Sequence, residues 1–120
     1  QGGNIMKNIQ DIINKIKELG WDVEDEEYFY LLSIFSPAEQ DFNIEIDKTD
    51  DIERFLEKIY QTYENYDVSE ETYLWLDNTG HGRNGAPYEM EDLLNDMKWC
   101  ENAILELYKD LNEFLHEEDL

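Results

Sequence analysis

The sequence predicts an α+β domain in which a small antiparallel sheet packs against helices. Apolar residues recur every three or four positions within residues 6–19, 52–63 and 87–116, as they do on one face of a helix. Residues 28–35 are aromatic and apolar almost throughout, and residues 41–47 alternate between polar and apolar side chains, and both patterns are typical of strands. Together these segments predict the order α-β-β-α-α-α with a long C-terminal helix.

The first helix is predicted to run from Met6 to Leu19, with Gly20 as its stop. Its apolar positions are Ile9, Ile12, Ile13, Ile16 and Leu19. Residues 21–27 then form a turn or a short third strand that carries five carboxylates.

The two main strands most simply form a hairpin joined by the loop at residues 36–40. The apolar run at residues 28–35 suits a strand that is buried on both faces. In the alternating segment, Phe42, Ile44 and Ile46 are expected to face the core.

Cap residues place the remaining helices. Asp50 or Asp51 can cap the second helix, and Asp67 precedes a short third helix with Glu70 placed for a capping box. The third helix is expected to carry Tyr73, Leu74 and Leu76. A loop with three glycines follows at residues 77–86, and Pro87 opens the longest helix, which is predicted to run to about His116.

Charge is the strongest functional signal, because 31 acidic and nine basic residues give a formal net charge of −22. A small domain needs a net charge of only about 2–8 for solubility, and a larger charge repels itself in the compact state. Residues 21–120 carry a charge of −23, so the acidity belongs to the body of the domain. The expected partner is therefore a basic protein, whereas nucleic acids and anionic membranes would be repelled.

Residues 1–5 are interpreted as a vector-derived remnant or a disordered start, and residues 6–120 as a single acidic α+β domain. The single cysteine, Cys100, cannot form an internal disulfide, which favours a cytoplasmic location. No apolar run reaches the roughly 18 residues that a membrane span needs.

The long helix carries the main site hypothesis. At 100° per residue its apolar positions share one face, namely Leu93, Met97, Cys100, Ile104, Tyr108, Leu111 and Leu115. Carboxylates gather on the other side, at Asp92, Asp96, Glu106, Asp110, Glu113 and Glu117. Neighbouring carboxylates on such a face lie about 5–6 Å apart, a separation comparable to that of phosphates along a nucleic-acid strand. The alternative is an ordinary solvated acidic face.

Trp99 falls near the centre of this acidic face, between Asp96 and Glu106. It is either an exposed aromatic anchor for a partner or a side chain that another element covers. A second group of candidate partner-binding carboxylates precedes the hairpin, at Asp22, Glu24, Asp25, Glu26 and Glu27.

No catalytic or metal-binding motif competes with this interpretation. His81, His116 and Cys100 make no zinc pattern, and Cys100 is expected in the core. Residues 77–82 begin with Asp and end with Gly like a calcium loop, but Tyr88 stands where the bidentate Glu should be. The glycine loop is either a surface connection or an interaction loop that presents His81 and Arg83. Neither a cofactor nor an enzymatic activity is predicted.

Three short stretches carry a resemblance, namely Ser36-Pro37-Ala38-Glu39-Gln40-Asp41-Phe42, Trp75-Leu76-Asp77 and Gly85-Ala86-Pro87. They resemble a family of small acidic proteins of unknown function from gut Firmicutes and their mobile elements. In size, acidity and order of elements the chain is also similar in type to phage anti-CRISPR and antirestriction proteins. That likeness implies a protein that presents carboxylates to the DNA-binding groove of a nuclease.

The sequence therefore favours a non-enzymatic acidic protein-binding module, in its most specific form a DNA mimic that inhibits a nucleic-acid-binding or defence nuclease. The alternative is a small regulatory or self-associating accessory protein whose acidity serves solubility. Both a monomer and a homodimer fit the sequence.

Overall fold

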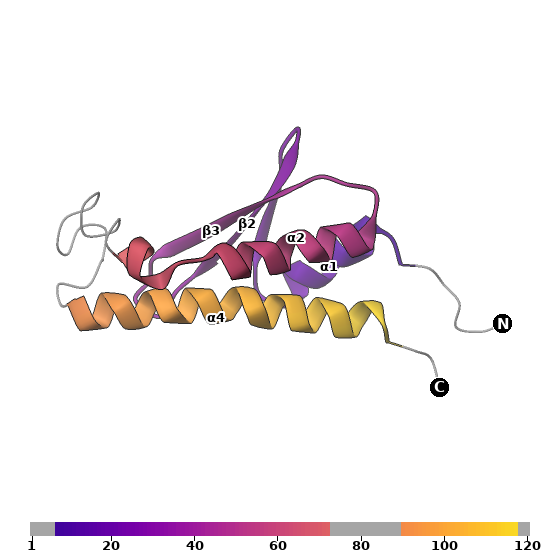
Figure 1. The fold of residues 1–120 in the computed structure, drawn as a ribbon. Helices are drawn as coiled ribbons and strands as arrows, with labels where there is room; N and C mark the ends of the chain where they lie inside the picture. Colours follow the sequence, from indigo (N-terminus) through magenta and orange to yellow (C-terminus); the bar gives the residue numbers. More distant parts are fainter. Residues whose placement is uncertain (1–6, 73–89, 118–120) are drawn as a thin grey trace.

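The computed structural model describes residues 7–72 and 90–117 and has the predicted α+β fold (Figure 1). Its elements are α1 (Ile9–Glu18), β1 (Asp22–Asp25), β2 (Phe29–Phe35), β3 (Asp41–Asp47), α2 (Ile52–Asn65) and α4 (Met90–Leu115). Residues 68–72 are also helical, and the Asp67 carboxylate accepts a hydrogen bond from the Glu70 N–H at 3.0 Å. Several predicted features lie outside the described residues, namely Tyr73, Leu74, Leu76, the glycine loop at 77–86 and Pro87.

Local capping fixes where the helices begin and end. Asn8 starts α1 with a capping box, in which its side chain accepts from the Asp11 N–H at 2.9 Å and the Asp11 carboxylate accepts from the Asn8 N–H at 2.8 Å. Gly20 adopts φ +103° just after α1, a conformation that favours glycine. Asp51 is the cap of α2, because its carboxylate accepts from the Arg54 N–H at 3.3 Å.

The sheet has three antiparallel strands in the order β1-β2-β3, so the short third strand is present and β2 is central. Val23, Leu32 and Ile44 stand in register across the three strands. They contribute to the hydrophobic core, so this face of the sheet is the inner one.

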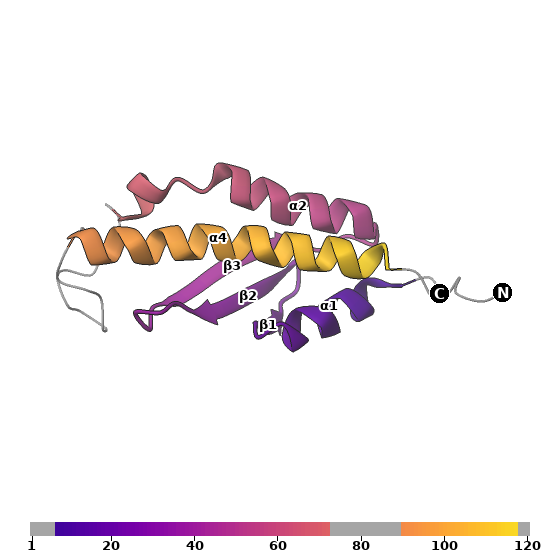
Figure 2. The same ribbon diagram turned by 90° about the horizontal axis from the view of Figure 1, so that it is seen from below.

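The helices α1, α2 and α4 cover the inner face of the sheet (Figure 2). In Figure 1 the sheet lies above α4, and α2 runs beside α4. The main core joins side chains of all these elements, among them Ile12, Ile16, Leu32, Ile46, Phe55, Ile59, Ile104 and Leu111. A smaller cluster of Leu93, Met97 and Cys100 continues the apolar stripe toward the start of α4.

The predicted apolar stripe of α4 is correct in most positions. Cys100 is fully buried, as expected for a core cysteine. Leu107, which the predicted stripe omits, is buried, whereas Tyr108 and Leu115 are only half-buried. The stripe is therefore centred slightly away from Tyr108, whose ring instead packs against Tyr60 with their centroids 4.9 Å apart.

The prediction that β2 is buried on both faces is wrong. Only Leu32 is fully buried in this strand, and Phe35 is 64% exposed. Since the described helices lie on one side of the sheet, the alternate residues of β2 receive no cover from them (Figures 1 and 2).

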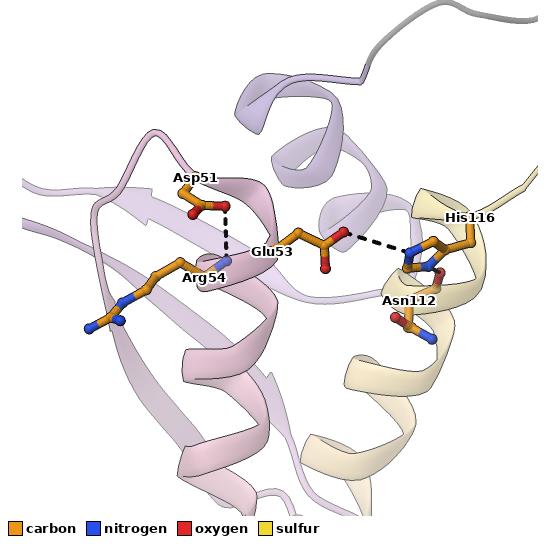
Figure 3. A network of polar contacts seen from close by, with 5 residues as sticks. All are labelled: Asp51, Glu53, Arg54, Asn112 and His116. Atoms are coloured by element: carbon orange, nitrogen blue, oxygen red, sulfur yellow. Dashed lines mark hydrogen bonds and ion pairs between the residues drawn. The ribbon is translucent and has the colours of Figure 1, made fainter.

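Polar contacts connect the start of α2 to the end of α4 (Figure 3). The Glu53 carboxylate lies 3.7 Å from His116 Nε2, and His116 Nδ1 lies 2.9 Å from the Asn112 carbonyl oxygen. These groups are exposed, so the pair contributes little to stability beyond orienting the helix ends.

We predict that the thermal midpoint rises with added salt and with a decrease in pH from 7 to about 5. Burial, followed by the nearby Glu70 and Asp67, raises the pKa of Glu71 above its usual value. An acid whose pKa is raised by folding binds protons more readily in the folded state, so stability increases as the pH falls through that pKa. Salt screens the repulsion of the −22 charge.

Thermal melts at several pH and salt values test this, with Glu71→Gln as the matched variant. That variant should show a smaller dependence on pH and an unchanged dependence on salt. A midpoint that stays flat or falls over this range would contradict the prediction.

Candidate functional site

A groove runs along the seam between α1 and α4. Its first part is a pocket of about 200 Å³. The pocket is lined by Leu19, Trp21, Ile34, Trp99, Asn102, Ala103, Glu106, Leu107 and Asp110. The floor is therefore largely apolar, and Glu106 and Asp110 supply carboxylates on the α4 side.

A second pocket of about 150 Å³ adjoins the first and shares Leu19 and Asp110 with it. Its lining residues are Lys15, Leu19, Asp110, Glu113, Phe114 and Glu117. We refer to the two pockets together as the α1–α4 groove.

Helix geometry explains why these side chains of α4 meet in one place. From Trp99, the residues Glu106, Asp110 and Glu113 follow at steps of seven, four and three positions, which keep them on one stripe of α4. Glu117 lines the same groove from just beyond the end of α4 at Leu115. The structure thus brings together five of the predicted site residues. The apolar opposite wall comes from the end of α1 and from Trp21, just before β1.

Trp99 is half-buried, so neither predicted alternative describes it fully. One part of the side chain packs against the cluster of Leu93, Met97 and Cys100. It also lines the groove. A half-buried indole held by packing on one side is a rigid apolar surface that a partner can contact.

Asp96 is a correction to the predicted site. The side chain is buried, with 4% of its surface exposed, and it does not belong to the exposed acidic face. Its Oδ2 accepts a hydrogen bond from Ser36 Oγ at 2.7 Å, and its Oδ1 accepts one from the Ala38 N–H at 3.1 Å. Asp96 therefore anchors the turn between β2 and β3 to α4, since these local donors satisfy the buried carboxylate.

The turn at residues 36–40 shows why such an anchor is needed. Glu39 has φ +63°, in the left-handed region that a residue with a side chain rarely adopts. The turn is closed by the Ser36 N–H, which donates to the Gln40 carbonyl at 2.9 Å. Two further hydrogen bonds from Ser36 and Ala38 to Asp96 hold it in that conformation.

The other predicted carboxylates lie outside the groove. Asp92 is exposed in the first turn of α4. Asp22 and Glu24 are exposed on β1, and the Asp25 carboxylate pairs with Lys48. Two more, Glu26 and Glu27, are exposed in the connection between β1 and β2.

This arrangement suits a cationic side chain with an apolar stem. Lysine and arginine can lay their methylene groups on an apolar floor and place the charged end beside carboxylates. Trp99 can add a cation–π contact with the same ligand group. Lys15 already lies at the second pocket, where it is 3.4 Å from Glu18 Oε1 and stacks over the Phe114 ring at 5.5 Å.

We next consider a metal site, a reactive cysteine and a membrane-spanning helix in the described part of the chain. Within residues 7–72 and 90–117, no group of three or more His, Cys, Asp or Glu side chains is placed to hold a metal ion. Burial, followed by the charges of Asp96 and Glu71, raises the pKa of the Cys100 thiol to about 12. The thiol is therefore protonated at neutral pH. None of the described helices has the length and apolar character needed to cross a membrane.

Sequence reasoning missed the wall that α1 contributes. Leu19 and Trp21 have the pattern of ordinary apolar positions, and Lys15 that of an ordinary surface base. Their role depends on the packing of α1 beside α4, about ninety residues later in the chain. No local pattern carries that information.

Comparison with known proteins adds no relative to this description. No protein-family model, curated protein or solved structure matches the chain. The resemblance to small acidic proteins of gut Firmicutes therefore stays a prediction.

We predict that Asp96→Ala lowers the free energy of unfolding by about 2–3 kcal/mol, because it leaves two donors without their acceptor. Asp96→Asn should lose less, since its amide can still pair with both groups. Asp92→Ala is the matched control and should change stability by less than about 0.5 kcal/mol. Urea denaturation measures all three variants, and equal effects at positions 92 and 96 would contradict the anchoring role.

Proposed function

We propose that this chain is a non-enzymatic acidic protein-binding module that binds a basic protein through the α1–α4 groove. The observation that supports the proposal is the meeting of Trp99 with four carboxylates around an apolar floor. A net charge of −22 adds long-range attraction for a cationic partner. We further propose that it acts in the cytoplasm, where a lone cysteine is typical.

The two parts of the groove suit different contributions to binding. The first pocket offers Trp99 and the apolar residues Leu19 and Ile34, which can bury the stem of a lysine or arginine. The second pocket carries three carboxylates, Asp110, Glu113 and Glu117. These carboxylates attract other basic side chains of the partner that lie next to that lysine or arginine. Exposed carboxylates of this kind mainly accelerate association, whereas a buried aromatic contact slows dissociation.

DNA mimicry is the more specific form of this proposal, with a DNA- or RNA-binding nuclease as the partner, as in anti-CRISPR and antirestriction proteins. The row of carboxylates at Glu106, Asp110 and Glu113 supports it, because the seven positions from Glu106 to Glu113 span about 10 Å along α4. The apolar floor of the groove goes beyond what a copy of a phosphate strand needs. It favours a partner that combines basic and apolar side chains.

The alternative is a regulatory or self-associating accessory protein whose acidity serves only solubility. This alternative does not require any particular carboxylate. The two hypotheses differ in one measurable respect. If the groove is the binding site, the effect of a charge reversal on partner binding depends on where the reversal is made, whereas under the alternative it does not.

The first test is capture of partners from a nuclease-treated bacterial lysate at low salt. We predict that Glu106→Lys combined with Glu113→Lys abolishes capture of a basic protein, because steering attraction becomes repulsion at the groove. Both residues are exposed, so the fold should persist. The matched control is Glu57→Lys with Glu64→Lys on the exposed face of α2, which makes the same change in net charge.

The control pair should retain most of the binding. Loss of capture to the same extent in both pairs would favour a general effect of charge. Full binding by the groove pair would remove the groove from the site.

Trp99→Ala should act on both stability and binding, since the indole packs on the core and also lines the groove. We expect a binding loss of about 2 kcal/mol, seen mainly as faster dissociation of the captured protein in a surface-binding assay. A melt of the same variant separates this loss from unfolding. An unchanged dissociation rate would exclude Trp99 as an anchor.

We also predict no measurable binding to duplex DNA or RNA at physiological salt. The lysines near α1 are too few to offset the carboxylates that surround them. A mobility-shift titration tests this directly. Micromolar binding to either duplex would contradict the proposed choice of partner.

A further inference from the structure

The outer face of the sheet carries an apolar stripe on its central strand. Tyr30, Leu32 and Ile34 point into the core, so the alternate residues of β2 point the other way. These include Phe29 and Leu31, which are half-buried, and Phe35, which is 64% exposed. An apolar stripe at the surface with a polar rim is typical of a protein-interaction site.

Carboxylates flank this stripe on both neighbouring strands. The strand register places Glu24 of β1 and Glu45 of β3 on either side of Leu31. The outward residues that pair with β2 on β1 and β3 are Asp22, Glu24, Asp41, Asn43, Glu45 and Asp47, and all are exposed. We call this surface, with Phe29, Leu31, Ser33 and Phe35 at its centre, the sheet face.

The described helices do not cover the sheet face, because α1, α2 and α4 pack on the inner side (Figures 1 and 2). The polar centre of the stripe is occupied by Ser33, whose hydroxyl donates to the Asn43 side chain across the strands. The face is thus apolar along one line and acidic on both sides of it.

We propose that the sheet face binds a cationic amphipathic helix of another protein. Seven residues of β2 span about 20 Å, which matches about 13 residues of helix. The acidic strands lie about 4.8 Å to either side of β2. A helix laid along β2 therefore places its apolar stripe on Phe29, Leu31 and Phe35 and its lysine or arginine flanks above the two acidic rows.

The charge of the face decides between this occupant and others. A second copy of the chain would bring exposed carboxylates such as Glu24 and Glu45 against carboxylates of the same kind, which disfavours self-association here. Nucleic acids and anionic lipids are disfavoured for the same reason. An added strand would pair with the edges of β1 or β3 and leave the apolar stripe uncovered.

This inference does not depend on the proposed groove. The sheet face uses no residue of the α1–α4 groove and lies on the opposite side of the sheet from α4 (Figure 1). A contact of this size is small for a protein interface, so binding in the micromolar range is expected.

The test uses a fluorescein-labelled 14-residue peptide with leucines on one helical face and lysines on both flanks. A scrambled peptide of equal composition, without the helical period, is its control. Anisotropy titrations at 0.15 M salt should give micromolar binding of the first peptide and at least tenfold weaker binding of the second. Circular dichroism should show helix in the bound peptide.

Position is tested with matched charge pairs. Glu24→Lys with Glu45→Lys should weaken binding at least tenfold, and Phe35→Ser should weaken it several-fold. The α2 control, Glu57→Lys with Glu64→Lys, should change it less than twofold. Each of these variants changes only exposed side chains, and thermal melts check that each variant folds.

Equal weakening by the sheet-face pair and the α2 pair would overturn the proposal, as would equal binding of the scrambled peptide. Weakening by the groove pair alone would place the peptide in the groove and also reject the sheet face. The proposed function is judged separately, because its readout is capture of a lysate protein by the groove pair. The two ideas can therefore fail independently.

Discussion

Burial of the apolar stripe of α4 is the interaction on which the rest of the structure depends. This helix contributes to both core clusters, and α1, α2 and the sheet gather around it. Full burial of one large apolar side chain is worth about 1.5–3 kcal/mol. Two exposed carboxylates about 5 Å apart repel each other by less than about 1 kcal/mol in water. The core can therefore hold together a chain of net charge −22 as long as the carboxylates stay at the surface.

Asp96 is the instructive exception to that rule. Its burial is tolerated because Ser36 and Ala38 supply donors to both oxygens, so the carboxylate replaces water with fixed hydrogen bonds. In return, the turn between β2 and β3 is tied to α4, and Glu39 is held at a positive φ. One acidic residue of α4 thus supports the fold, whereas Glu106 and Glu113 of the same helix remain exposed.

The sequence predicted the elements well because their signals are local. The caps at Asp51 and Asp67 and the stop at Gly20 lie within one turn of the helix ends that they define. It predicted the site less well because exposure depends on distant segments. Asp96 lies three residues after Leu93 and four before Cys100, at the border between the apolar stripe and the acidic face, and the turn that buries it comes from residues 36–40.

The same limit explains the error at β2. A run of aromatic and apolar residues is typical of a strand that is buried on both faces, but the pattern does not show which segments would cover each face. In the described fold the helices supply one face, and Phe35 remains exposed on the other. In the groove the structure supplies a contact that the sequence did not predict. Leu19 and Trp21 form the wall opposite Trp99, and no sequence pattern near Trp99 indicates this.

These observations separate two uses of acidic residues on one small domain. General solubility needs only a large net charge, and any surface position serves it equally. Several carboxylates of this chain instead lie beside half-buried or exposed aromatic residues, near Trp99 in the groove and near Phe35 on the sheet face. An apolar group beside like charges adds nothing to solubility, whereas it gives a cationic partner a desolvated contact. The pairing of aromatic and acidic side chains is therefore the argument for binding, and net charge alone is not.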